Sequence, residues 1–111
     1  MKEIITIQEL VKQTKELQKL FRQAEHKPWT IDTFVMELLA ETGTLADSIM
    51  IKEQYRKPRP IQPQINLEDD VCDVLFVLFM IADYYGINIE KSYKKMIDST
   101  RKKLESSMNL S

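Results

Sequence analysis

The segment from Leu67 to Gly86, LEDDVCDVLFVLFMIADYYG, constrains the fold of this chain more than any other stretch. Three acidic residues open it, and an almost unbroken apolar run follows, interrupted by Asp73. A helix that is apolar on every side has no solvent face and must be surrounded by protein. We therefore expect a buried helix in which Asp73 is enclosed as well. An ionised carboxylate away from water needs a cation or several hydrogen-bond donors, because leaving it unpaired costs several kcal/mol.

Length and composition indicate a single all-α domain over residues 1–111. The chain has 111 residues, of which 43% are hydrophobic, so it can bury one small core. Its only glycines are Gly43 and Gly86, and alternation typical of strands is scarce. We find no internal repeat and no domain boundary.

The charge balance and the single cysteine narrow the class of partners. Sixteen basic and seventeen acidic residues give a net charge of -1, so no overall field attracts nucleic acid or an anionic membrane. The apolar run is too short for a bilayer, which needs roughly 20 residues. MKEIITIQEL is too short an apolar start for a secretory signal. With Cys72 expected in the core, these features favour a cytoplasmic protein.

Capping and periodicity predict four helices at residues 6–25, 30–54, 67–85 and 89–105, with a loop over 55–66 that contains three prolines. The expected N-caps are Thr6, Thr30, Asn66 and Asn88. Gly86 is placed as the left-handed residue that ends the third helix. Four such helices predict a four-helix bundle. Because the third helix has surplus apolar surface, we expect a homodimer or homotetramer.

Apolar spacing predicts which faces of the first two helices turn inward. The expected inward positions of the first helix are Ile7, Leu10, Thr14, Leu17, Phe21 and Ala24. Those of the second helix are Ile31, Phe34, Leu38, Glu41, Leu45 and Ile49. A carboxylate, that of Glu41, thus occupies a core-facing position, and Glu37 lies one turn earlier on much the same face.

Carboxylates from two helices are therefore expected to converge. Asp70 and Asp73 share one face of the third helix, and Glu41 lies on a helix that should pack beside it. Three such groups repel one another in a low-dielectric interior, and a bound cation relieves that repulsion. Oxygen ligands without histidine or thiolate favour Mg²⁺ or Mn²⁺ over zinc. Such a site commonly binds substrate phosphates, which indicates phosphoryl chemistry.

Structural interpretations of the same residues stay open. Asp70 lies in the first turn of a helix, where acidic residues are common because they complement the helix dipole. Asp73 and Glu41 could each pair with a lysine or arginine of the last helix. His26, the only histidine, does not follow a glutamate by three residues, so a di-iron bundle is excluded.

The order of these motifs resembles the MazG-like, all-α nucleoside triphosphate pyrophosphohydrolases over about residues 29–104. The first motif stands here as Ala40-Glu41-Thr42-Gly43-Thr44-Leu45. The second stands as Asp69-Asp70-Val71-Cys72-Asp73-Val74-Leu75, and IADYYGINIEKSYKKMIDSTRKK looks like the family's fourth helix.

The resemblance implies a set of site residues. Glu41, Asp70 and Asp73 match catalytic metal ligands, whereas Thr44 stands where the family has a further glutamate, for which Glu37 could substitute. The implied substrate contacts are Lys95, one place off the usual lysine, Arg101, which matches a basic position, and Trp29. Trp29 could stack on a nucleobase or anchor the start of the second helix in the core.

The implied activity is Mg²⁺-dependent hydrolysis of a nucleoside triphosphate to a monophosphate and pyrophosphate, of the "house-cleaning" kind that removes unwanted nucleotides. One alternative is a catalytically weakened member that binds nucleotides or serves in assembly. It is favoured by the departures at Thr44, at Met96, which stands where the family has its lysine, and at Thr100, which stands where an asparagine is common. A second alternative is an adaptor for nucleic acid or protein that uses the basic residues of 52–59 and 91–103.

Overall fold

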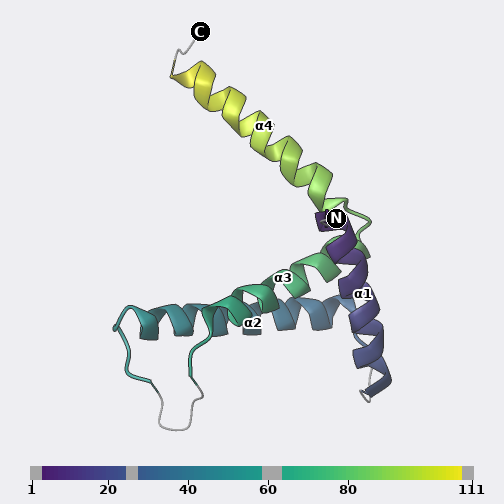
Figure 1. The fold of residues 1–111 in the computed structure, drawn as a ribbon, viewed down its shortest axis with the longest axis vertical. Coiled ribbons are helices and arrows are strands. Elements are labelled where there is room, and N and C mark those ends of the chain that lie inside the picture. Colours follow the sequence, from purple (N-terminus) through teal and green to yellow (C-terminus); the bar gives the residue numbers. More distant parts are fainter. Residues whose placement is uncertain (1–3, 25–27, 59–63, 109–111) are drawn as a thin grey trace.

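A computed structural model describes residues 4–24, 28–58 and 64–108. These residues form four helices and no strand: α1 (Ile7–Ala24), α2 (Ile31–Lys52), α3 (Leu67–Tyr84) and α4 (Ile89–Ser107) (Figure 1). The predicted all-α class and the number of helices are therefore confirmed for this part of the chain. The predictions for Glu25, for His26 and for residues 59–63 of the loop lie outside it.

Side-chain caps set the helix ends much as the sequence predicts. Thr30 accepts a hydrogen bond from the Thr33 backbone, and Asn66 and Asn88 do the same for Asp69 and Lys91. The Thr6 hydroxyl accepts from the Glu9 N–H at 3.1 Å. Gly86 has φ +66°, a left-handed conformation that a side chain disfavours, so the chain can turn sharply between α3 and α4.

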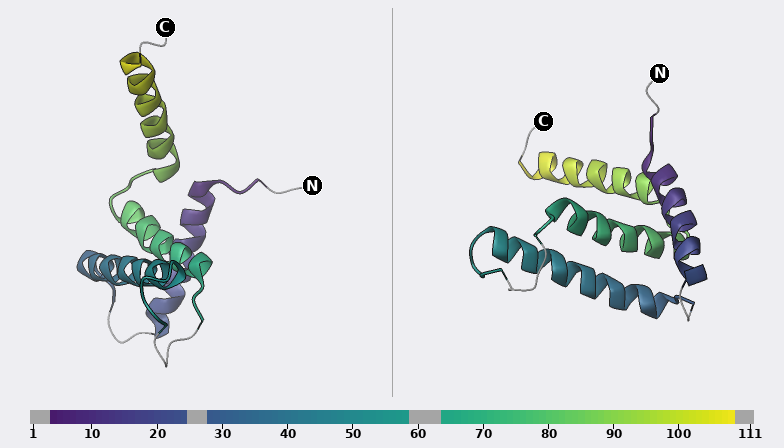
Figure 2. Two further views of the ribbon diagram at one scale, coloured as in Figure 1. Left: turned by 90° about the vertical axis from the view of Figure 1, so that its left-hand side faces the viewer. Right: turned by 60° about the horizontal axis from the view of Figure 1, so that its bottom comes forward.

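Helices α2 and α3 lie side by side, and α1 crosses them near the start of α2 (Figures 1 and 2). The core of this layer is Phe34 of α2 with Val77 and Met80 of α3, all at most 5% exposed. Trp29 and Phe76 pack against that core. Burial of apolar side chains between α2 and α3 thus holds the two acidic helices together.

Helix α4 extends away from the other three and meets α3 at 100° (Figure 1). Its start is tied to the start of α1, because the Ile7 N–H donates to Glu90 Oε1 at 3.0 Å and the Glu90 N–H donates to Gln8 Oε1 at 3.4 Å. The radius of gyration is 18.1 Å, against about 13 Å for a compact domain of 100 residues. A single chain therefore leaves much of its helical surface uncovered.

Helix α3 is buried along one face only, which corrects the expectation that it is enclosed. Val71, Leu75 and Leu78 are 46%, 42% and 38% exposed. Cys72, expected in the core, is also exposed. Hydrophobicity predicted an enclosed helix, but among the described residues the helices that pack extensively on α3 are α2 and α1, since α4 turns away from it.

The inward face of α1 is also displaced from the predicted one. Val11 and Gln18 are buried, with only 5% and 2% of their surface exposed, whereas Leu17 and Phe21 are 44% and 47% exposed. Successive residues on a helix are about 100° apart, so the buried line shares Thr14 with the predicted stripe but passes through Val11 and Gln18 in place of Leu10 and Leu17. This shift places a polar side chain, Gln18, inside the protein.

Among the described residues, no single helix is both long and apolar enough to cross a membrane, although α3 and α4 taken as a bent pair have the necessary length and composition.

Candidate functional site

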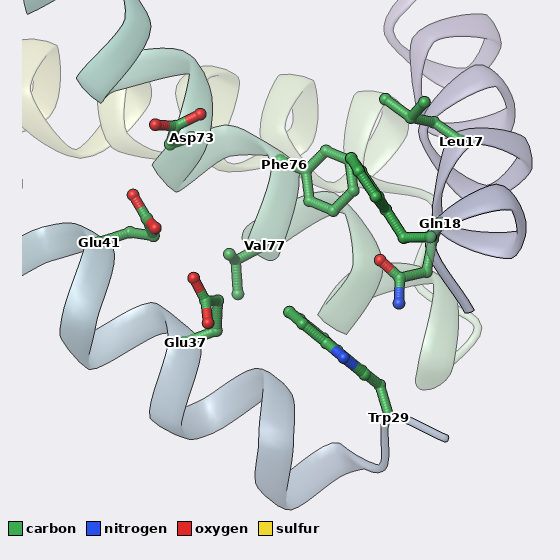
Figure 3. A pocket seen from close by; sticks show the side chains of 9 residues that line it. Leu17, Gln18, Trp29, Glu37, Glu41, Asp73, Phe76 and Val77 are labelled. Atoms are coloured by element: carbon green, nitrogen blue, oxygen red, sulfur yellow. The ribbon is translucent and has the colours of Figure 1, made fainter. Parts of the chain in front are cut away.

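A cavity of about 340 Å³ lies where α1, α2 and α3 meet (Figure 3). One side of it carries the carboxylates of Glu37, Glu41 and Asp73. The remaining lining is mostly apolar and consists of Leu17, Gln18, Phe21, Trp29, Phe76 and Val77. The volume falls in the range of small-molecule sites, about 300–1,000 Å³. The cavity therefore has an acidic end and an aromatic end.

The acidic end is built by helical spacing on two neighbouring helices. Glu37 and Glu41 are one turn apart on α2, and Asp73 faces them from α3 (Figure 3). Glu41 is half-buried and has a side-chain hydrogen bond with Glu37. The structure thus brings together two of the three predicted ligands, Glu41 and Asp73. It also places beside them Glu37, the predicted substitute for the glutamate that is missing at Thr44.

The environment of Glu41 raises its pKa from 4.5 to about 7. Burial is the largest cause, because it disfavours the charged form. The hydrogen bond with Glu37 is next, and the charges of Asp73, Glu37 and Asp70 act in the same direction. Near neutral pH, Glu41 is therefore divided between its protonated and ionised forms.

Asp70 and Asp73 differ in their surroundings. Asp73 is exposed in the single chain, so the expectation that it is enclosed is wrong at this level. Asp70 is partly buried, and its Oδ2 is buried with no hydrogen-bond partner in the part of the chain described. An unpaired buried carboxylate oxygen is costly, and a cation is one means of satisfying it.

The donor set fits a hard cation in its chemistry, because every candidate ligand is a carboxylate oxygen. In residues 4–24, 28–58 and 64–108, however, no three acidic, histidine or cysteine side chains converge into a group that could hold a metal ion. The carboxylates would have to turn toward a common point to do so.

The alternative in which these carboxylates form structural ion pairs finds no support within the described segments. The ion pairs found among the described residues are Lys15 with Asp83, Arg56 with Asp47, and Lys94 with Asp98. None of these involves Glu41, Asp70 or Asp73.

The aromatic end is formed by rings from three segments. Phe21 of α1 meets Phe76 of α3 edge to face, with ring centroids 6.1 Å apart. Trp29, just before α2, meets Phe34 in the same manner at 5.5 Å. Trp29 therefore lines the cavity and also contacts the core, so both of its predicted roles are compatible with its position.

Gln18 is a lining residue that the sequence reasoning missed. It is 2% exposed, and it belongs to the buried line of α1 that continues from Val11 through Thr14 at spacings of three and four. A polar residue at helical spacing from Val11 was the available signal. The more hydrophobic positions Leu17 and Phe21 obscured it.

Three other predicted positions lie away from the cavity. Lys95 and Arg101 are exposed on α4, which extends away from α2 and α3, so one chain does not bring them to the acidic end (Figure 1). Thr44 is exposed, and its hydroxyl donates to the Ala40 carbonyl at 3.1 Å. Thr44 therefore adds no group to the cavity lining.

Fold and site together define the chain as an all-helical protein with a cavity that is acidic at one end and aromatic at the other. Comparisons with family models, with curated proteins and with solved structures find no match.

Proposed function

We propose that this protein is a Mg²⁺-dependent nucleoside triphosphate pyrophosphohydrolase that converts an NTP or dNTP to the monophosphate and pyrophosphate. The observation that carries the proposal is the two-ended cavity, in which Glu37, Glu41 and Asp73 lie at one end and Trp29 and Phe76 at the other. A nucleotide has a polyphosphate that binds metal ions and a flat base that stacks on aromatic rings. The resemblance to MazG-like enzymes is consistent with this assignment.

Glu41, Asp70 and Asp73 are the proposed ligands of Mg²⁺ or Mn²⁺, and Glu37 is a fourth candidate. A bound divalent ion would neutralise charge on the phosphate oxygens and orient the attacking water. Without a cation, these carboxylates would repel a triphosphate. The raised pKa of Glu41 reflects burial and the same crowding of negative charge.

In the proposed reaction, water attacks the α-phosphorus and the bond from that phosphorus to the α–β bridging oxygen breaks. Pyrophosphate leaves with the electron pair of that bond, and the water oxygen stays on the monophosphate. A carboxylate at the acidic end takes up the proton of the water. Glu37 is suited to this role because it faces the cavity and contacts Glu41 without being one of the three principal ligands.

The direct test is pyrophosphate release from a panel of ribo- and deoxyribonucleoside triphosphates with Mg²⁺. We expect release from at least one of them, loss of release when EDTA removes the metal, and recovery when Mg²⁺ is restored. No release above background for any triphosphate, together with no Mg²⁺ binding by calorimetry, would exclude the enzyme. The assay is best run at about pH 8, where Glu41 is mainly ionised.

A nucleotide-binding protein without hydrolysis is the second candidate. It is favoured by Thr44, which supplies no carboxylate where the MazG-like family has a further glutamate. Mg²⁺-dependent binding of a triphosphate without pyrophosphate release would identify this candidate instead.

We also propose that the protein acts as a homodimer or homotetramer in the cytoplasm. The outer face of α3 exposes Val71, Leu75 and Leu78, and α4 exposes a further apolar line along its length, formed by Tyr93, Met96, Leu104 and Met108. Association would cover these side chains. Sedimentation equilibrium at micromolar concentration is expected to give a mass of two or four chains. The mass of one chain would contradict this assembly.

A further inference from the structure

Gln18 presents an unsatisfied amide inside the protein. The residue is 2% exposed, and neither Nε2 nor Oε1 has a hydrogen-bond partner among the described residues. A buried donor and acceptor that stay unpaired oppose folding, so such groups usually have a partner. Gln18 lines the two-ended cavity, and it also lines a smaller hollow of about 90 Å³ together with Lys15 and Asp83.

On the side of the two-ended cavity, the lining near Gln18 is flat and mostly apolar. Figure 3 shows Gln18 at the cavity wall between Phe76 and Trp29, across from the carboxylates of Glu37 and Glu41. This part of the cavity is thus bordered by ring systems and by the side chain of Leu17. A partner that fits here is planar, largely apolar on its faces and polar at its edge.

A nucleobase meets these requirements. Each base carries a hydrogen-bond donor and an acceptor side by side on its pairing edge, and a glutamine amide carries the complementary pair. Proteins commonly bind unpaired bases, or bases flipped out of a duplex, by stacking them on aromatic side chains and by hydrogen bonds to that edge. A buried water could also satisfy the amide, but water requires neither ring surface nor the space of the cavity.

We infer that Gln18 is a specificity residue that pairs with the edge of a nucleobase held at the aromatic end of the cavity. The inference rests on the proposed function, because it assigns the base of the nucleotide whose phosphates would face Glu41 and Asp73. It extends that proposal by naming the group that reads the base.

The test uses the fluorescence of Trp29, the only tryptophan of the chain, which lines the cavity. The probes are adenosine and cytidine, and analogues of each that lack the exocyclic amine, purine riboside and 2-pyrimidinone riboside. The Mg²⁺ complexes of the α,β-methylene triphosphates, which resist cleavage between the α and β phosphates, are titrated in parallel. We expect the wild type to bind at least one natural nucleoside about tenfold more tightly than its analogue, equivalent to one good hydrogen-bonding contact.

The decisive variant is Gln18→Met, which keeps the length of the side chain and removes both polar atoms. Its preference for the natural nucleoside over the analogue is expected to disappear. Its melting temperature is expected to stay level or rise, because an unpaired amide leaves the interior. Gln13→Met, at an exposed position of the same helix, is the matched control and should keep the preference.

Two results would overturn the inference. One is an equal preference in the wild type and in Gln18→Met, which would leave Gln18 as a structural or water-bound residue. The other is no quenching of Trp29 by any nucleoside or Mg²⁺–methylene analogue. The proposed hydrolysis is judged separately, because Gln18-dependent binding without pyrophosphate release would retain this site and reject the enzyme. Hydrolysis with a base preference unchanged by Gln18→Met would support the enzyme and reject Gln18 as the residue that reads the base.

Discussion

The Asp73→Asn variant is expected to release pyrophosphate at least about a hundredfold more slowly than the wild type while remaining folded. Asp73 lines the acidic end of the cavity and is a proposed metal ligand. Asparagine keeps the size of the side chain but removes the charge that a divalent cation needs. Because Asp73 is exposed and its charge raises the pKa of Glu41, removing that charge should leave stability unchanged or increase it slightly.

The measurements for Asp73→Asn are initial rates of pyrophosphate release and the midpoint of urea unfolding. Glu68→Gln is the matched control, because it removes one negative charge from an exposed position of the same helix that does not line this cavity. It should keep its rate. Strong unfolding of Asp73→Asn would instead identify a structural ion pair, and a rate equal to that of the control would remove Asp73 from the mechanism.

The helix boundaries were predictable because local chemistry determines them. Thr30, Asn66 and Asn88 satisfy backbone N–H groups of the first turn, whatever the helix packs against. The left-handed Gly86 is likewise a local feature. These signals require no knowledge of the neighbouring helices.

The faces that turn inward were less predictable, because packing decides them. In α1 the buried line passes through Gln18, although Leu17 and Phe21 are more hydrophobic. The apolar sequence of α3 gives no preferred side, so it could not show that Cys72 and Leu75 are exposed in one chain. Hydrophobicity indicates that a side chain favours burial, but it does not say whether the same chain or another one covers it.

The acidic end of the cavity was predictable only in part. The spacing of Glu37 and Glu41 places them on one face of α2, and Asp70 and Asp73 share a face of α3 in the same way. Their meeting depends on α2 packing beside α3, which the Phe34, Val77 and Met80 core provides. The positions of Lys95 and Arg101 depend on the direction of α4, and no local signal sets that direction.

In the metal-free protein, the contribution of the Glu41 carboxyl to the free energy of unfolding is expected to fall as the pH rises from about 5 to 8. Glu41→Gln is expected to abolish this contribution to the pH dependence. The folded state raises the pKa of Glu41 to about 7 from 4.5. Between these values the folded protein holds a proton that the unfolded chain has released, so raising the pH favours unfolding. For a half-buried group screened by solvent, the contribution is about 1–2 kcal/mol.

Urea unfolding at pH 5 and pH 8 in EDTA measures this effect as the difference between the wild type and Glu41→Gln. Taking the difference cancels the other titrating groups, and Glu16→Gln, at an exposed position of α1, controls for the loss of one charge. Glu41→Gln should exceed the wild type in stability mainly at pH 8. The same pH dependence in both proteins would show that Glu41 is not crowded by its neighbours.

Because a cation competes with the proton for these oxygens, Mg²⁺ should stabilise the wild type more at pH 8 than at pH 5 and have little effect on Glu41→Gln.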